Sequence, residues 1–149
     1  MYFTLDSPDG MGKDDIYVSL WSEKGYAKPA LLSANINTEG FEFNAFVSKD
    51  ESFLLYTKYN AEGGFGSGDL YISRKDADGK WEKGLNLGNI INTSSMEYCP
   101  FYHGKTLTLY FTSRRNLLQS KKFNGISEFQ EYINSENGLS KIYKTRIIF

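Results

Sequence analysis

The sequence predicts an all-β fold built from repeats of one antiparallel four-stranded unit, and three observations support this prediction. First, residues 26–58 align without a gap with residues 81–113, and a fixed period of this size indicates a repeat protein. Second, the 149 residues include 11 Tyr, 11 Phe and 2 Trp, which favour half-buried strands. Third, glycine-rich turns recur at matching places between short runs of strand-forming residues.

Identical residues mark the repeat most clearly in its central part. Each copy has an Ile-Asn-Thr triplet, then a glutamate, then a phenylalanine, at the same spacing. Such residues are expected to occupy equivalent places in equivalent structural units. The matched residues are Ile36-Asn37-Thr38 with Ile91-Asn92-Thr93, Glu42 with Glu97, and Phe46 with Phe101.

The second copy predicts four short strands separated by turns. Polar and apolar residues alternate in its first strand, and its last strand is rich in aromatic and β-branched residues. Four strands in one period, with glycines at fixed places, fit one blade of a β-propeller. The predicted elements are a glycine-rich turn at 63–68, a strand at 69–73, a turn at 76–79, an outer strand at 81–87, a loop at 89–95, a strand at 98–102, a tight turn at 103–105 and a strand at 107–113.

The first copy follows the same order, and a third copy is degraded. A glycine turn at 10–12 precedes a strand at 15–19, and residues 2–4 match the ends of the later long strands. The third copy is reduced to residues 142–143, with Lys141 in place of the aspartate of the earlier copies. We therefore expect a partial β-propeller of about two to three blades. The expected domain spans 1–149, with repeats at about 2–56, 56–111 and 111–149.

One segment interrupts the third copy. Residues 123–135 stand where its glycine-rich turn should be. Residues 127–130 have the S-x-x-Q pattern of a capping box, and Phe129, Tyr132 and Ile133 fall on one helical face. We expect a short helix at about 127–133, and the alternative is a long loop.

The motifs of the second copy, taken together, resemble a known family. They are Asp69-Leu70-Tyr71-Ile72-Ser73, the aromatic Trp81, the segment 86–93, the segment 97–100 and Leu109-Tyr110-Phe111-Thr112-Ser113. In this combination they resemble the WD40-like β-propeller repeat of TolB-type proteins. The first copy is a looser match, because Ala45 replaces the proline. The resemblance covers nearly the whole chain and implies a binding scaffold of the bacterial envelope, sometimes joined to a peptidoglycan-binding OmpA-like domain.

A β-propeller has four to eight blades, so two to three blades predict only a part of one. We expect the C-terminal portion of a larger propeller, with the remaining blades of the parent chain as its partners. An incomplete ring would leave apolar blade faces open. No signal peptide is visible in the sequence, and the resemblance implies a periplasmic, outer-membrane-associated or secreted location.

Composition excludes several classes of function. The formal net charge is −1 and the 17 basic residues are scattered, so there is no electrostatic footprint for nucleic acid. No apolar run reaches the roughly 18 residues of a membrane span. Cys99 and His103 are the only residues of their types, which excludes an internal disulfide and a histidine-rich metal site. We expect no catalytic residue, metal or cofactor.

Four acidic residues are the best candidate binding residues. Glu42 and Glu97 occupy equivalent places just before the strand that should line the propeller axis, where they could hold a cation or a basic peptide. The favoured alternative is structural, with each glutamate accepting hydrogen bonds from its own loop. Asp15 and Asp69 receive the same interpretation, because a carboxylate at a turn exit typically satisfies backbone donors.

Other motifs are interpreted as structural. The glycine-rich segment 64–68 is followed by a strand instead of the helix that a nucleotide loop needs, so it predicts a turn. The acidic segment 76–79 lacks the distal ligands of a calcium loop. His103 has no second histidine or nucleophile motif beside it. Cys99 aligns with Asn44, which suggests a packing position.

The leading hypothesis for function is a non-catalytic β-propeller module that binds a protein or glycan partner. The alternative is a glycoside hydrolase in which Glu42 and Glu97 form the carboxylate pair, which requires a separation of about 5 to 9.5 Å. We expect Trp81 to pack partly against its own sheet. The residues expected in the packed interior are Tyr71, Phe101, Leu109 and Phe111.

Overall fold

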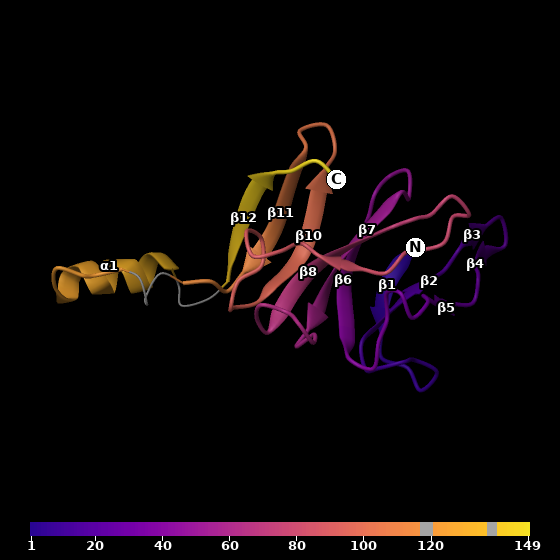
Figure 1. Cartoon of the computed structure of the whole chain (residues 1–149), viewed down its shortest axis with the longest axis horizontal. Helices are drawn as coiled ribbons and strands as arrows, with labels where there is room; N and C mark the ends of the chain where they lie inside the picture. The colour runs from indigo at the N-terminus through magenta and orange to yellow at the C-terminus, as the bar shows by residue number, and fades with distance from the viewer. Residues whose placement is uncertain (117–120, 137–139) are drawn as a thin grey trace.

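The computed structural model describes residues 1–116, 121–136 and 140–149, which fold into small antiparallel sheets and one helix (Figure 1). Within these segments, no helix is long and apolar enough to cross a membrane. The elements are β1 (Tyr2–Leu5), β2 (Asp15–Val18), β3 (Trp21–Ser22), β4 (Gly25–Tyr26), β5 (Ala30–Leu31), β6 (Phe41–Val47), β7 (Phe53–Tyr59), β8 (Gly68–Arg74), β9 (Leu85–Asn86), β10 (Glu97–His103), β11 (Thr108–Ser113), α1 (Ile126–Glu136) and β12 (Lys141–Arg146).

Three sheets follow one another along the chain. The first sheet has the order β1-β2-β5, the middle sheet β6-β7-β8-β9 and the third sheet β10-β11-β12, while β3 and β4 form a separate hairpin. Among the described residues only the middle sheet has four strands, so the expectation that each blade has four is wrong for the other two. The reason is the order of the strands: β6 and β10, which we call the inner strands, stand at one edge of their sheets, and β5 and β9, which we call the outer strands, stand at the other edge of theirs. The first sheet therefore lacks an inner strand, and the third lacks an outer one.

The three sheets share one feature of strand register. In each sheet, an aromatic residue of one strand pairs directly with a tyrosine of the neighbouring strand. Such directly opposed aromatic pairs stabilise a sheet through side-chain packing. The pairs are Phe3–Tyr17, Tyr56–Tyr71 and Phe111–Tyr143, with ring centroids 6.2, 5.9 and 5.9 Å apart.

Both inner strands contain a β-bulge at the same place. The register of β6 shifts after Phe43 and that of β10 shifts after Tyr98. The next residue in each strand, Asn44 or Cys99, has a left-handed φ of 54° or 51°. The Cys99 side chain is exposed, so its interpretation as a packing residue is wrong. The aligned asparagine reflects a bulge, because asparagine tolerates the left-handed conformation better than most residues.

The apolar core lies between the sheets. One cluster joins the first and middle sheets through residues such as Ile16 and Tyr56, and another joins the middle and third sheets. The predicted interior positions of Tyr71, Leu109 and Phe111 are confirmed by their burial. Phe101 is 50% exposed, so its prediction is wrong. It follows the bulge on an inner strand, where its ring contacts the rings of Phe46 and Tyr110.

The predicted helix is confirmed, but it starts one residue earlier and ends three residues later than predicted. Ser127 therefore lies within the helix, and the predicted capping box that begins there is wrong. Helix α1 begins at Ile126, and Glu128 accepts hydrogen bonds from the backbone and side-chain nitrogens of Asn124 at 2.9 and 3.0 Å. Glu128 therefore caps this end of the helix by reaching back along the chain. The Phe123 ring packs on the Phe129 ring from outside the helix. The helix lies to one side of the sheets (Figure 1).

Gly66 makes a close backbone approach, which leads to a first testable prediction. A Cβ atom on Gly66 would overlap the carbonyl oxygens of Thr93 and Ser95. Gly66→Ala should therefore destabilise the protein by about 3 kcal/mol, the upper end of the usual cost of overpacking. Equilibrium denaturation would measure this loss. Gly125 has open space around its Cβ position, so Gly125→Ala is the control. Equal midpoints for both variants would contradict this packing.

Candidate functional site

The two candidate glutamates hold the loops that precede their strands. Glu97 accepts hydrogen bonds from the Thr93 backbone nitrogen at 2.7 Å and the Thr93 hydroxyl at 2.8 Å. Glu42 accepts the same two bonds from Thr38 at 2.8 and 2.6 Å. Both glutamates are fully buried. The loop geometry is thus repeated in detail, because the Ile-Asn-Thr triplet and the glutamate act together in each copy.

A cation balances the charge of each glutamate, by a different route in each copy. Lys58 pairs with Glu42 across the sheet, and its ammonium group lies 3.3 Å from the Glu42 carboxylate. Ser113 pairs in the same way with Glu97 and donates its hydroxyl to it. A guanidinium nitrogen of Arg115 also lies 3.4 Å from a carboxylate oxygen of Glu97. Each buried carboxylate therefore has a counterion within the protein, which limits the cost of its burial.

The two candidate aspartates organise the glycine-rich turns. Asp69 accepts hydrogen bonds from the backbone nitrogens of Phe65 at 2.6 Å and Gly66 at 3.3 Å. Asn86 also donates to Asp69, at 3.0 Å. Asp15 accepts equivalent backbone bonds from Met11 and Gly12 at 2.7 and 3.0 Å. The glycine-rich turns therefore bind a carboxylate of their own chain, in agreement with the structural interpretation of this segment.

Asp15 has one unsatisfied oxygen. Its Oδ1 is buried without a hydrogen-bond partner, because Met11 and Gly12 both donate to Oδ2. In Asp69 the two turn nitrogens donate to different oxygens, and Asn86 adds a further bond. Leu31 pairs with Tyr17 where Asn86 pairs with Tyr71, so the first sheet has no amide at this position. An unsatisfied buried acceptor is costly, so this corner should be less stable than its equivalent.

Two asparagines complete the repeated networks, and the sequence argument did not identify them as key residues. Asn92 accepts a bond from the backbone nitrogen of Leu70 at 2.8 Å and donates to its carbonyl oxygen at 3.0 Å. Asn37 holds the backbone of Ile16 in the same manner, at 2.8 and 2.9 Å. Their recurrence in the Ile-Asn-Thr triplet was the signal for this role. Each asparagine fixes a loop to a central strand by replacing a strand partner.

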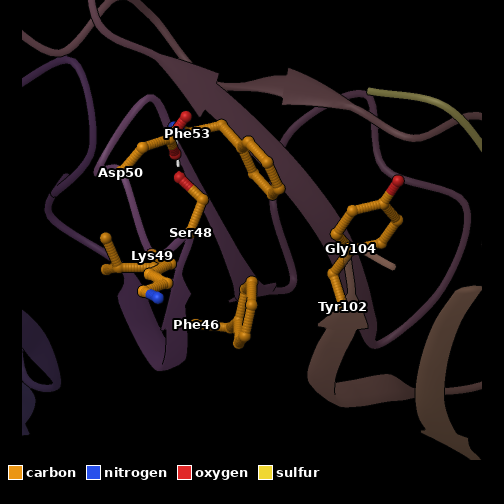
Figure 2. Close-up of a pocket in the computed structure, with 8 residues that line it drawn as sticks. Phe46, Ser48, Lys49, Asp50, Phe53, Tyr102 and Gly104 are labelled. Carbon is orange, nitrogen blue, oxygen red and sulfur yellow. Dashed lines mark hydrogen bonds between the residues drawn. The ribbon is translucent and has the colours of Figure 1, made fainter. Parts of the chain in front are cut away.

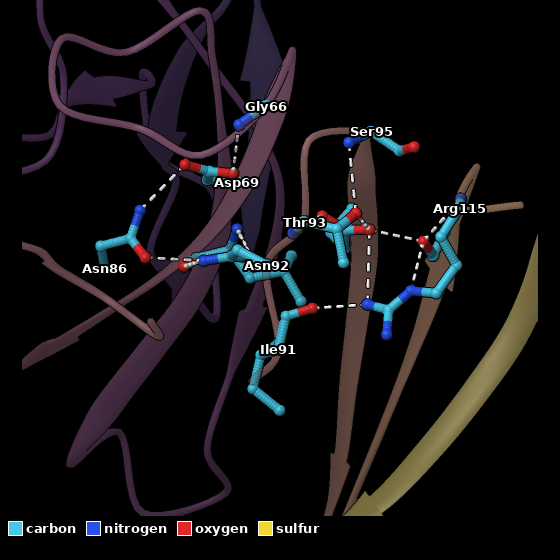
Figure 3. Close-up of polar contacts among 11 residues, drawn as sticks. Gly66, Asp69, Asn86, Ile91, Asn92, Thr93, Ser95 and Arg115 are labelled. Atoms are coloured by element: carbon cyan, nitrogen blue, oxygen red, sulfur yellow. Dashed lines mark hydrogen bonds and ion pairs between the residues drawn. The ribbon is translucent and has the colours of Figure 1, made fainter. Parts of the chain in front are cut away.

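These contacts favour the structural interpretation of the four acidic candidates. Figure 3 shows two groups of contacts, one around Asp69 and Asn92 and one around Thr93 and Arg115, which meet in the loop that precedes β10. The bonds to the carboxylates come from loop backbones, hydroxyls and counterions of the chain itself. Within the described segments, no three His, Cys, Asp or Glu side chains are grouped as a metal site would require. A catalytic pair also needs access to substrate, and both glutamates are fully buried.

The remaining sequence candidates also lie in local turns. Asp76 accepts bonds from the backbone nitrogens of Asp78 and Lys80 at 2.9 and 2.8 Å, which is typical of an Asx turn. The exposed His103 contacts the hydroxyl of Thr106 at 2.8 Å, within the turn that joins β10 to β11. These residues therefore stabilise turns.

A pocket of about 710 Å³ lies where the β6–β7 hairpin faces the end of β10. Figure 2 shows Phe46 and Phe53 on one side of the pocket and Tyr102 on the other. The Phe53 ring meets the Tyr102 ring edge-on, with centroids 5.6 Å apart. The pocket therefore joins two sheets, and sequence reasoning missed it because its walls are about 50 residues apart in the chain. The lining residues are Phe46, Val47, Ser48, Lys49, Asp50, Phe53, Tyr102 and Gly104.

Most polar groups of this pocket form hydrogen bonds within the β6–β7 hairpin. The Ser48 hydroxyl accepts a bond from the Phe53 backbone nitrogen at 3.1 Å, and the Ser52 hydroxyl donates to Asp50 at 2.8 Å. The hydroxyls of Ser48 and Ser52 lower the pKa of Asp50 to about 2. Asp50 is therefore charged at neutral pH. The pocket combines an aromatic floor with one anionic and one cationic side chain, Asp50 and Lys49.

A second hollow, of about 530 Å³, lies between the segment 34–40 and the middle sheet. Its lining includes Glu42 and Lys58, which form an ion pair with each other. Lys83 and the acidic Glu39 and Glu62 also line it. Because charges of both signs are mixed there and one pair is already formed, this hollow has no clear preference for a charged ligand.

Comparison of this chain with protein families, curated proteins and solved structures found no match.

Proposed function

We propose that this chain is a non-catalytic binding module, formed by part of a β-propeller, which holds an apolar side chain of a protein partner. The observation that carries this proposal is the aromatic pocket at the ends of β6, β7 and β10. Its volume of about 710 Å³ falls within the range of pockets that bind small ligands. Aromatic residues are also the groups that most often anchor protein interfaces.

The propeller interpretation is supported by the repeated sheets and by the repeated contacts between them. Lys13 donates its backbone nitrogen to Gly40, and Ser67 donates to Ser95 at the next junction, at 3.2 and 3.0 Å. Successive blades of a propeller meet through such repeated contacts. The resemblance to TolB-type repeats supports a place in the periplasm, at the outer membrane or outside the cell.

A protein partner fits the pocket better than a glycan. Sugars bind through many hydrogen bonds, but the Tyr102 hydroxyl donates to the Ile147 carbonyl at 3.0 Å and the hydroxyls of Ser48 and Ser52 bond each other at 3.3 Å. The rings of Phe53 and Phe149 also pack against each other at 5.3 Å, which leaves less flat ring surface for stacking. An apolar side chain needs only the burial that the pocket provides.

Hydrolysis by Glu42 and Glu97 remains the alternative function. It is less well supported, because a glycosidase needs one carboxyl group to protonate the leaving group and another to attack or to activate water. Both carboxylates here already accept several hydrogen bonds from the protein. Activity toward aryl glycosides that is lost in Glu97→Gln at unchanged stability would favour this alternative.

Blocking the pocket tests the proposed function. Gly104 lines the pocket, and a Cβ atom there would meet only the edge of Tyr102 at 4.0 Å. Gly104→Phe should therefore fill the pocket without disturbing the sheets. We expect N-acetyl-leucinamide and N-acetyl-tryptophanamide to shift amide NMR signals of the pocket, and the variant to bind at least about 10-fold more weakly, equal to about 1.4 kcal/mol.

The control is Gly125→Phe, which places the same side chain in open space beside α1. It should bind both amides like the unchanged protein. Chitobiose serves as the glycan probe in the same titration. Shifts caused by chitobiose alone would support a glycan ligand, and equal binding of the amides to both variants would refute the pocket as the site.

A further inference from the structure

One cationic side chain of the aromatic pocket is not used by the protein. Lys49 lies in the turn between β6 and β7, is exposed, and lines the pocket together with Phe46 and Phe53. Within the described segments, its ammonium group forms no ion pair with a carboxylate and no hydrogen bond. A polar group at the wall of an apolar pocket selects and orients the ligand. The Lys49 ammonium therefore favours a ligand that carries an anionic group.

The neighbouring anionic side chain, Asp50, is held by its own turn. Its Oδ1 atom accepts hydrogen bonds from the backbone nitrogen of Ser52 at 3.2 Å and from the Ser52 hydroxyl at 2.8 Å. Its Oδ2 atom accepts no hydrogen bond from the part of the chain that the structure describes. Since each carboxylate oxygen is an acceptor, Oδ2 can receive an N–H group of a ligand. The turn therefore offers a cation and an acceptor at adjacent positions.

These two polar groups stand at one edge of the aromatic floor. Figure 2 shows Lys49 and Asp50 on the same side of the pocket as Phe46 and Phe53, with Tyr102 on the opposite side. Because the hairpin turn is short, a ligand that reaches both polar groups must carry them close to the apolar group that covers the rings. The pocket thus matches a small unit that combines an apolar side chain, an anion and an N–H donor.

We propose that the pocket binds the C-terminal residue of a protein partner, with its apolar side chain on the aromatic floor, its carboxylate at Lys49 and its backbone N–H at Asp50. This inference rests on the proposed function and specifies which part of the partner enters the pocket. A C-terminal residue carries all three groups on one Cα atom, and capture of a terminal carboxylate is a recurring mode of peptide recognition. An internal residue has no carboxylate on its backbone, and an N-terminal residue offers an ammonium group instead.

Derivatives of one amino acid test which end of a chain the pocket binds. N-acetyl-leucine imitates a C-terminal residue, N-acetyl-leucinamide an internal residue and leucinamide an N-terminal residue. In amide NMR titrations at low salt, N-acetyl-leucine should bind about 3- to 5-fold more tightly than N-acetyl-leucinamide, which is the effect of one solvent-accessible ion pair. This preference should decrease at high salt, because salt screens such a pair.

Lys49→Met tests the residue that binds the carboxylate. The substitution removes the charge and keeps an unbranched apolar side chain, so N-acetyl-leucinamide should bind as before and the preference for N-acetyl-leucine should disappear. Lys24→Met is the matched control, because it changes the net charge equally at an exposed position that does not line the pocket. It should retain the preference of the unchanged protein.

Isocaproate tests the role of the backbone N–H. It has the branched chain and carboxylate of N-acetyl-leucine but no amide, so it should bind more weakly than N-acetyl-leucine. Tightest binding of leucinamide or isocaproate, or a preference for N-acetyl-leucine that persists in Lys49→Met, would overturn the proposal. Equal binding of N-acetyl-leucine and N-acetyl-leucinamide would overturn this inference alone, whereas failure of all these probes to bind would refute the proposed function as well.

Discussion

Trp81→Ala is expected to lower the free energy of unfolding by about 4 kcal/mol, which is within the range for removing a large aromatic side chain from a core. Trp81 is only 9% exposed and belongs to the cluster that joins the first and middle sheets. Its ring meets the edge of the Tyr2 ring at 6.3 Å, and the Lys75 ammonium lies 4.9 Å from its centroid. The residue therefore links its own sheet to the preceding one. Urea denaturation followed by circular dichroism would measure the loss.

Tyr26 offers a matched control for this prediction. It aligns with Trp81 in the repeat, but it is 58% exposed, and its ring contacts Trp21 in the β3–β4 hairpin. Tyr26→Ala should change the free energy of unfolding by no more than about 0.5 kcal/mol, as for most surface substitutions. If Trp81→Ala has an equally small effect, the ring is exposed in solution, and stacking on a ligand becomes the better interpretation.

This pair of residues shows how much of the fold the sequence predicted. The repeat placed both aromatics at equivalent points of equivalent units, and the expected contact of Trp81 with its own sheet is confirmed by its cluster with Tyr56 and Tyr71. Their different burial could not be predicted, because it depends on whether a preceding sheet is present. Alignment within a chain predicts local geometry, whereas burial depends on the neighbouring unit.

The errors at Cys99 and Phe101 have a common physical cause. Residues 98–102 were predicted as a strand without a bulge, but a bulge after Tyr98 shifts the register. One extra residue in a strand moves the following side chains relative to the partner strand. The Asn44 alignment contained a hint of the bulge, because asparagine is enriched at left-handed positions.

The candidate site was predicted in its residues but not in its role. The sequence left both interpretations of Glu42 and Glu97 open. Glutamates that recur at equivalent places could either form a ring of charges that binds a ligand or hold the loops that precede their strands. The hydrogen bonds from Thr38 and Thr93 favour the anchors. The aromatic pocket depends on packing between separate hairpins, and no local pattern in the sequence predicts such a contact.

Glu97→Gln is expected to destabilise the protein by about 3 kcal/mol, because removing one partner of a buried ion pair leaves the other uncompensated. One Glu97 oxygen accepts from the Thr93 backbone, and the other accepts from the hydroxyls of Thr93 and Ser113 and lies near Arg115. An amide nitrogen at either place would face donors and lose their bonds. Thermal and urea denaturation would measure the loss.

The matched control is Glu131→Gln, which removes the same charge from an exposed position on α1 and should leave stability unchanged. Glu42→Gln should have an effect similar to that of Glu97→Gln, because its two bonds from Thr38 repeat those from Thr93. A titration with Ca²⁺ and Mg²⁺ separates the anchoring role from a binding role. If Glu97→Gln keeps full stability but abolishes a response to these ions, Glu97 binds a cation. Replacing a residue that only holds its loop would instead destabilise the protein.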